Sequence, residues 1–181
     1  MAVLNYQAGE VNTLVTRPNW GAIWAGAFTF IAIWSVFGLL GMAIFASAAN
    51  PAAPQPITGM SIGMAIWIVI LTIIAMYVAG RVTGHLAGIA NSRDGMTHGM
   101  IMFGLSVTAA IALIAFAGSA ATGGTTLAAV GSHSPYVLTL FADMGWVGFA
   151  ALLLGWVAAM GGASTGAKMK VIAPQPPRAT T

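Results

Sequence analysis

Four long runs of uncharged, mostly apolar residues account for most of this 181-residue chain. They cover about residues 22–48, 60–82 with a helical continuation to about 90, 97–120 and 138–162. About 20 such residues are enough for a helix to cross the hydrocarbon core of a bilayer. All eight prolines lie outside the runs, as expected if helices stop where the ring removes a donor. The sequence therefore predicts an all-α, polytopic membrane protein with four transmembrane helices.

The composition excludes several other classes of protein. Hydrophobic residues make up 59% of the chain and charged residues 5%, whereas a soluble domain carries roughly 25% charged residues. Cysteine is absent, which removes disulfides and thiolate metal sites. The six Lys and Arg residues are too few for a nucleic-acid footprint. We expect the lipid bilayer to be the main partner, together with other integral membrane subunits or further copies of the chain, and no nucleic acid.

All the basic residues are expected on one side of the membrane. The connections at 50–59 and 121–136 contain no Lys or Arg. Because basic residues favour the cytoplasmic side, both termini are predicted to be cytoplasmic and the four helices to form an antiparallel bundle. The basic residues precede the first run, surround the turn between the second and third, and follow the fourth: Arg17, Arg81, Arg93, Lys168, Lys170 and Arg178.

Three segments are predicted along the chain. Residues 1–19 form a cytoplasmic N-terminal segment that lacks the pattern of a removable signal peptide. Residues 20–166 form the four-helix transmembrane domain, and residues 167–181 form a disordered, basic and proline-rich cytoplasmic tail. Trp34 lies far from both predicted interfaces, so we expect it to pack between helices.

Glycines recur at helical spacing in two of the runs. Small residues on one face allow two helix backbones to approach closely. These faces either hold the four helices of one protomer together or, for at least one of them, contact another subunit. The second run has a glycine at every fourth residue and the fourth run at every seventh: Gly80, Gly84, Gly88, Gly148, Gly155 and Gly162.

The cytoplasmic turn between the second and third runs contains the densest polar set. His85 and His98 lie at similar depth and could be the axial ligands of a haem b, with Arg81 and Arg93 holding its propionates. Closely packed glycine faces leave little room for a macrocycle, so the alternative is interfacial histidines that hydrogen-bond to backbone, water or headgroups. Arg81 is expected to extend its side chain to the headgroups or to pair with Asp94, which is also a candidate cap of the third helix.

Catalysis and ion-coupled transport are not expected. No charged residue lies in the middle of a run, whereas coupled transporters usually bind their ion through such a group. One outer segment contains the residue types of a catalytic triad without the elbow motif that positions a nucleophile. We therefore expect no enzyme activity from these residues, which are Ser132, His133, Ser134 and Asp143.

Three short motifs are shared with a known group of proteins. They are Trp-Gly-Ala at residues 20–22, Gly-Arg at residues 80–81 and Asp-Gly-Met-Thr-His-Gly at residues 94–99. With these motifs, residues 20–115 resemble a family of small, uncharacterised four-helix integral membrane proteins of bacteria, sometimes labelled PhnA-like. The resemblance includes Arg81 and His98 but gives no place to His85. It implies a multi-pass protein of the bacterial inner membrane and supplies no activity.

The functional expectation is a non-catalytic accessory or assembly subunit. Such a subunit would pack against a larger membrane complex through its glycine-rich helix faces. One alternative is a small oligomeric channel or transporter, which would need a polar lining. The other is a haem-carrying electron-transfer subunit with His85 and His98 as ligands.

Overall fold

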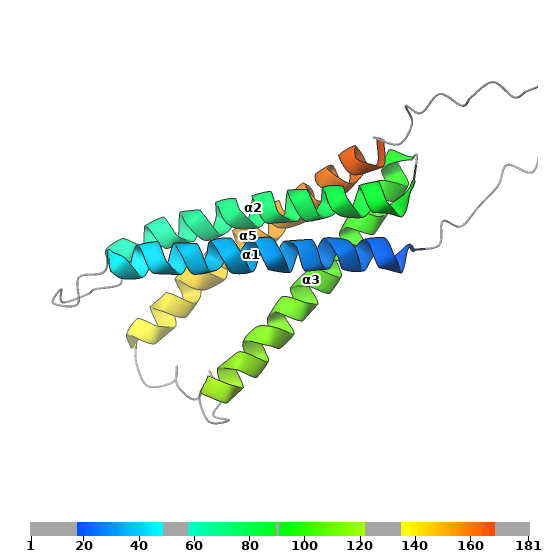
Figure 1. The fold of residues 1–181 in the computed structure, drawn as a ribbon. Coiled ribbons are helices and arrows are strands. Elements are labelled where there is room, and N and C mark those ends of the chain that lie inside the picture. Colours follow the sequence, from blue (N-terminus) through cyan, green and yellow to red (C-terminus); the bar gives the residue numbers. More distant parts are fainter. Residues whose placement is uncertain (1–17, 49–57, 90, 122–134, 169–181) are drawn as a thin grey trace, which may run out of the picture.

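The computed structural model describes residues 18–48, 58–89, 91–121 and 135–168. Within these ranges the chain forms four α-helices and no strand, as Figure 1 shows. The helices are α1 (Trp20–Ser47), α2 (Thr58–Ala87), α3 (Ser92–Ala121) and α5 (Pro135–Lys168). The prediction of an all-α chain is confirmed for the described residues.

Each helix is long and apolar enough to cross a membrane. The apolar spans are Trp20–Ser47, Ile62–Ala87, Ser92–Leu113 and Gly145–Lys168. This finding agrees with a multi-pass membrane protein with four spans.

The helices differ most from their predicted runs at two ends. Helix α3 begins at Ser92 instead of near residue 97, and α5 ends at Lys168 instead of near residue 162. Helix α5 thus continues two residues past the predicted domain boundary at residue 166, because its last turns still pack on α2 through Gly166. The predicted N-terminal segment up to residue 17 and the tail from residue 169 lie outside the described residues, as does the Ser132–Ser134 segment.

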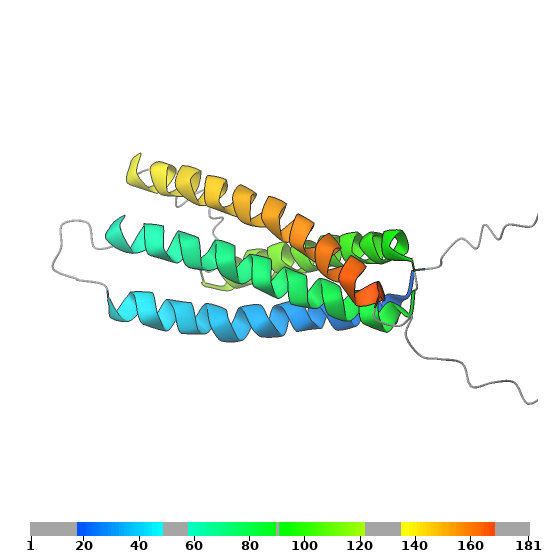
Figure 2. The same cartoon turned by 90° about the horizontal axis from the view of Figure 1, so that it is seen from above.

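The helices gather at one end of the molecule and separate at the other. Figures 1 and 2 both show the start of α1, the end of α2, the start of α3 and the end of α5 close together. We call this the narrow end. Helices α1 and α2 lie side by side along their length, whereas α3 and α5 diverge from them away from the narrow end (Figure 1).

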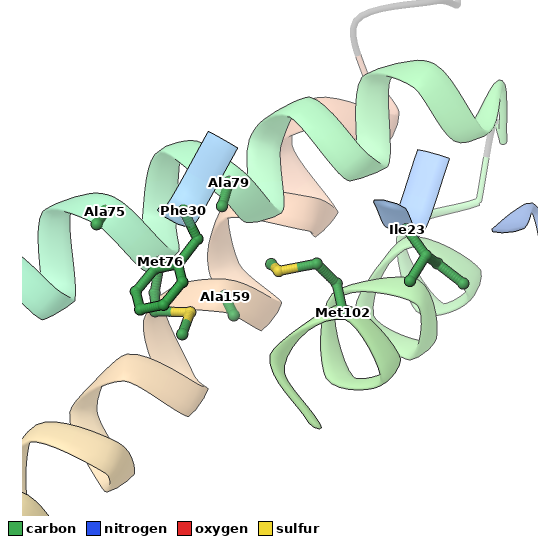
Figure 3. Close-up of a cluster of buried hydrophobic side chains, with 7 residues drawn as sticks. All are labelled: Ile23, Phe30, Ala75, Met76, Ala79, Met102 and Ala159. Carbon is green, nitrogen blue, oxygen red and sulfur yellow. The ribbon is translucent and has the colours of Figure 1, made fainter. Parts of the chain in front are cut away.

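The buried core is small and consists largely of small residues and methionine. Most large apolar side chains point outward, such as Phe116 with 75% of its surface exposed, as expected when the solvent is lipid. Trp34 is also exposed instead of packing between helices, because α1 turns its ring over Gly38 of the same helix. The core draws on all four helices (Figure 3) and contains Ile23, Phe30, Ala75, Met76, Ala79, Met102 and Ala159.

Candidate functional site

Helices α2 and α5 form the most extensive interface in the fold. A β-carbon at Gly80 would overlap the backbone carbonyl of Ala159, and one at Gly84 would overlap that of Ala163. The relation is reciprocal, because a β-carbon at Gly162 would overlap the carbonyl of Tyr77. Such contacts let backbones touch directly, which is how small residues join helices where lipid removes the hydrophobic driving force.

The same face of α5 also receives α3. A β-carbon at Gly95 would lie 2.9 Å from both the carbonyl oxygen of Ala163 and the β-carbon of Ala167. One at Gly99 would lie 2.7 Å from the β-carbon of Ala163. Residues four apart share a helix face. Ala159, Ala163 and Ala167 therefore form an alanine ridge that fits against glycines of two neighbouring helices.

The remaining glycines of the two predicted stripes are placed differently. A β-carbon at Gly155 would lie 3.2 Å from the methyl group of Thr72, so Gly155 faces α2. Gly148 has no atom of the described residues within 4 Å of its β-position, because α5 has left α2 at that level. Gly88 is exposed, follows the last residue of α2 and has φ of 71°. It ends the helix through a left-handed conformation and does not extend the packing face.

Near the narrow end, helix α1 packs against α2 through Gly26. A β-carbon at Gly26 would overlap the hydroxyl oxygen of Thr83 and lie 2.9 Å from the carbonyl of Ala79. The buried hydroxyl of Thr83 donates to the Ala79 carbonyl at 3.0 Å, and that of Ser106 donates to the Met102 carbonyl at 2.9 Å. These hydroxyls are satisfied within their own helices, so they do not line a polar path.

His98 connects α3 to the beginning of α1. Its ring is buried, and its Nδ1 lies 2.8 Å from the Asp94 carbonyl oxygen, which can only accept. Nδ1 therefore carries the proton, and Nε2 accepts from the backbone N–H of Asn19 at 3.1 Å. Asn19 is itself the N-cap of α1, since its side-chain oxygen accepts from the N–H of Ala22 at 3.2 Å. His98 thus fixes the residue at which α1 starts.

The hydrogen bonds of His98 oppose the predicted ligation of haem by His85 and His98. Both ring nitrogens of His98 are engaged with backbone groups, so iron could reach Nε2 only by displacing the Asn19 N–H. His85 is exposed near the end of α2. Neither histidine lines the apolar cavity between α1 and α2. The described residues contain no group of three His, Asp or Glu side chains that could hold a metal ion.

The cap of α3 is Asn91, not Asp94. The side-chain oxygen of Asn91 accepts from the N–H of Arg93 at 3.1 Å, and its carbonyl accepts from Gly95 at 3.1 Å. Asp94 lies in the first turn, where a negative charge is favourable next to the free N–H groups. The side chains of Arg81 and Arg93 are exposed at the narrow end.

Several packing residues were missed by the sequence analysis although the sequence carried a signal for them. Gly95 and Gly99 are four residues apart, as are Gly162 and Gly166, and the alanine ridge repeats at the same interval. A search for small residues at every fourth position would have found them. The seven-residue spacing predicted in α5 joins Gly148, which has no described atom within 4 Å of its β-position, to two glycines that do pack.

The chain was compared with protein families, with curated proteins and with solved structures, and no match was found in any of the three.

Proposed function

We propose that the chain is a non-catalytic accessory or assembly subunit of a larger membrane complex in the bacterial inner membrane. The observation that carries the proposal is a contrast within α5. Gly155, Gly162 and Gly166 are covered by α2, whereas Gly145 and Gly148 have no described atom within 4 Å of their β-positions. The open pair lies three residues apart on the part of α5 that has diverged from the bundle. A partner helix can approach the backbone closely at such a place.

The proposal limits the part of this chain that can contact a partner subunit. Gly80, Gly84 and Gly162 are occupied within the chain, so they cannot also hold a partner. The exposed apolar side chains beside the open glycines, Trp146 and Phe149, form an edge-to-face pair with ring centroids 6.3 Å apart. We assign the partner contact to this part of α5, defined by residues 145–149.

The proposed threading is an antiparallel bundle with both termini in the cytoplasm. The end of α2, the start of α3 and the end of α5 meet at the narrow end (Figure 1). Lys168 is the last residue of α5, Arg93 is the second residue of α3, and Arg81 lies six residues before the last residue of α2. Basic residues favour the cytoplasmic side, so the narrow end is assigned to the cytoplasm. The separated ends of α3 and α5, with the proposed contact on α5, then face the outer half of the membrane.

The test compares two glycines of α5 that are both open. Gly148→Leu places a large side chain on the proposed contact, and Gly161→Leu places the same side chain where the described residues also leave open space. We expect gentle-detergent purification followed by mass spectrometry to lose the co-purifying membrane subunits for Gly148→Leu and to keep them for Gly161→Leu. Equal recovery with the two variants, or no co-purifying subunit with the parent chain, would contradict the proposal.

A further inference from the structure

A half-open apolar cavity lies between α1 and α2. Its volume is about 220 Å³, and no polar atom is exposed in its wall. Leu71 is buried beneath it, while Phe37, Ile70 and Ile74 are about half exposed around it. The lining residues are Ile33, Phe37, Trp67, Ile70, Leu71 and Ile74.

One wall of this cavity is held in place by two contacts across the helix pair. The indole of Trp67 lies against Gly41, where a β-carbon would overlap the ring. Its Nε1 donates to the Phe37 carbonyl at 3.2 Å. The only polar atom among the lining side chains is therefore satisfied, and the ring presents carbon to the cavity.

The position of the cavity along the helices restricts what can enter it. Ile33 lies 13 residues after the first residue of α1 and 14 before the last. At a rise of about 1.5 Å per residue, that is about 20 Å from either end of the helix. At this depth the cavity opens onto the hydrocarbon of the bilayer, where acyl chains are the abundant neighbours.

The apolar wall excludes water and polar ligands from this cavity. A bound water needs two to four polar partners, and a polar ligand group left without a partner costs several kcal/mol in hydrocarbon. An apolar cavity of about 150 Å³ in another protein stays dry and takes up benzene. A cavity of about 220 Å³ has room for a larger apolar group, and filling it restores the dispersion contacts that an empty wall lacks.

We propose that this cavity is a binding site for one lipid acyl chain. The open side of the cavity lets the rest of the acyl chain extend into the surrounding lipid. An acyl chain held in the cavity exchanges with bulk lipid more slowly than acyl chains that touch the other exposed apolar side chains of the protein.

The test uses the full chain in vesicles of phosphatidylcholine, a fraction of which carries a photoactivatable diazirine at the middle of one acyl chain. After illumination and digestion, mass spectrometry locates the adducts. We expect them to be several-fold more frequent on Phe37, Ile70 and Ile74 than on Phe28, which is at least as exposed. We also expect the adducts on these cavity residues to persist when the vesicles are dissolved in excess detergent before illumination, because a held acyl chain exchanges slowly, while the adducts on Phe28 are lost.

Two variants on the same face of α2 provide the matched comparison. Ile70 and Ile66 are one helical turn apart and are 50% and 56% exposed, but only Ile70 lines the cavity. Ile70→Trp should lower the adduct yield on Phe37 and Ile74 several-fold, and Ile66→Trp should not.

Three outcomes would overturn the proposal. The first is equal labelling of the cavity and of Phe28, in the vesicles or after detergent is added. The second is an equal effect of the two tryptophan variants. The third is a cavity labelled less than Phe28, because a segment of protein would then cover it. The detergent measurement uses only the parent chain, so it decides the question even if Ile70→Trp does not fold.

Discussion

The side chain of His98 connects α3 to the start of α1 through hydrogen bonds to backbone groups. The His98→Ala variant leaves the Asn19 N–H and the Asp94 carbonyl without their partner and opens a space where the ring was buried. We expect a loss of about 1–3 kcal/mol in the free energy of unfolding. Faster amide hydrogen exchange at Ala22 and Ile23, in the first turn of α1, should accompany it.

The matched control for this variant is His85→Ala. Because His85 is exposed, its removal should change the free energy of unfolding by no more than about 0.5 kcal/mol. Thermal unfolding followed by circular dichroism in detergent compares the two. An equal effect of the two substitutions would contradict the role assigned to His98.

The same residue decides the test for haem. Once the chain is separated from any co-purifying subunit, we expect it to show no Soret band and no reduced α-band. The reason is that both ring nitrogens of His98 are hydrogen-bonded to backbone groups. An absorption spectrum of the oxidised and reduced protein checks this. A Soret band that stays with the purified chain and disappears in His98→Ala would favour the electron-transfer alternative.

At the level of helices, the interface between α2 and α5 has no room for a β-carbon at Gly80, Gly84 or Gly162. Gly84→Ala introduces a β-carbon onto the Ala163 carbonyl, so the two backbones must separate. We expect a loss of about 1–3 kcal/mol, and more for Gly84→Leu. Unfolding titrations in mixed micelles measure the difference.

Gly104→Ala is the control for this prediction. Gly104 is helical and has no described atom within 4 Å of its β-position, so alanine meets no obstacle there. Alanine also favours the helix by up to about 1 kcal/mol relative to glycine. The control should therefore be neutral or stabilising, and a destabilisation equal to that of Gly84→Ala would show that clearance is not what matters.

The helices themselves were predictable from the sequence because lipid imposes a simple rule. A span must be apolar over about 20 residues, and the four runs satisfy this whatever their neighbours are. The start of α3 was missed by five residues, because Asn91 caps the helix ahead of the charged residues Arg93 and Asp94. Polar residues inside the first turn made the helix appear shorter than it is.

The partners of each helix face were not predictable, since spacing identifies a small face without saying what covers it. Gly88 continues the interval of Gly80 and Gly84 but lies beyond the helix end. Gly148 continues the interval of Gly155 and Gly162 but lies where α5 has diverged. Whether each of these glycines packs depends on where its helix ends or diverges from its neighbour. The spacing of glycines in the sequence gives neither position.

For the whole molecule, the narrow end carries the basic residues that the threading proposal rests on. A reporter fused after Thr181 should be cytoplasmic, and one inserted near Ala53 should be external, because the Lys and Arg bias sets the orientation. Alkaline phosphatase and fluorescent protein fusions in bacterial cells measure this. Finding both reporters on the same side would overturn the assignment of four spans.

The alanine ridge of α5 has a geometric consequence for how the helices can slide. Its residues repeat every four positions, and so do Gly80 and Gly84, which they meet. Moving α5 by one turn, about 5.4 Å, would place Gly80 on Ala163 and Gly84 on Ala167 with the same backbone clearance. The alanine repeat alone therefore does not select one register. The glycines of α5 make the selection, because the same shift would replace Gly166 with a residue that has a β-carbon, and the Arg81 carbonyl leaves no room for one there.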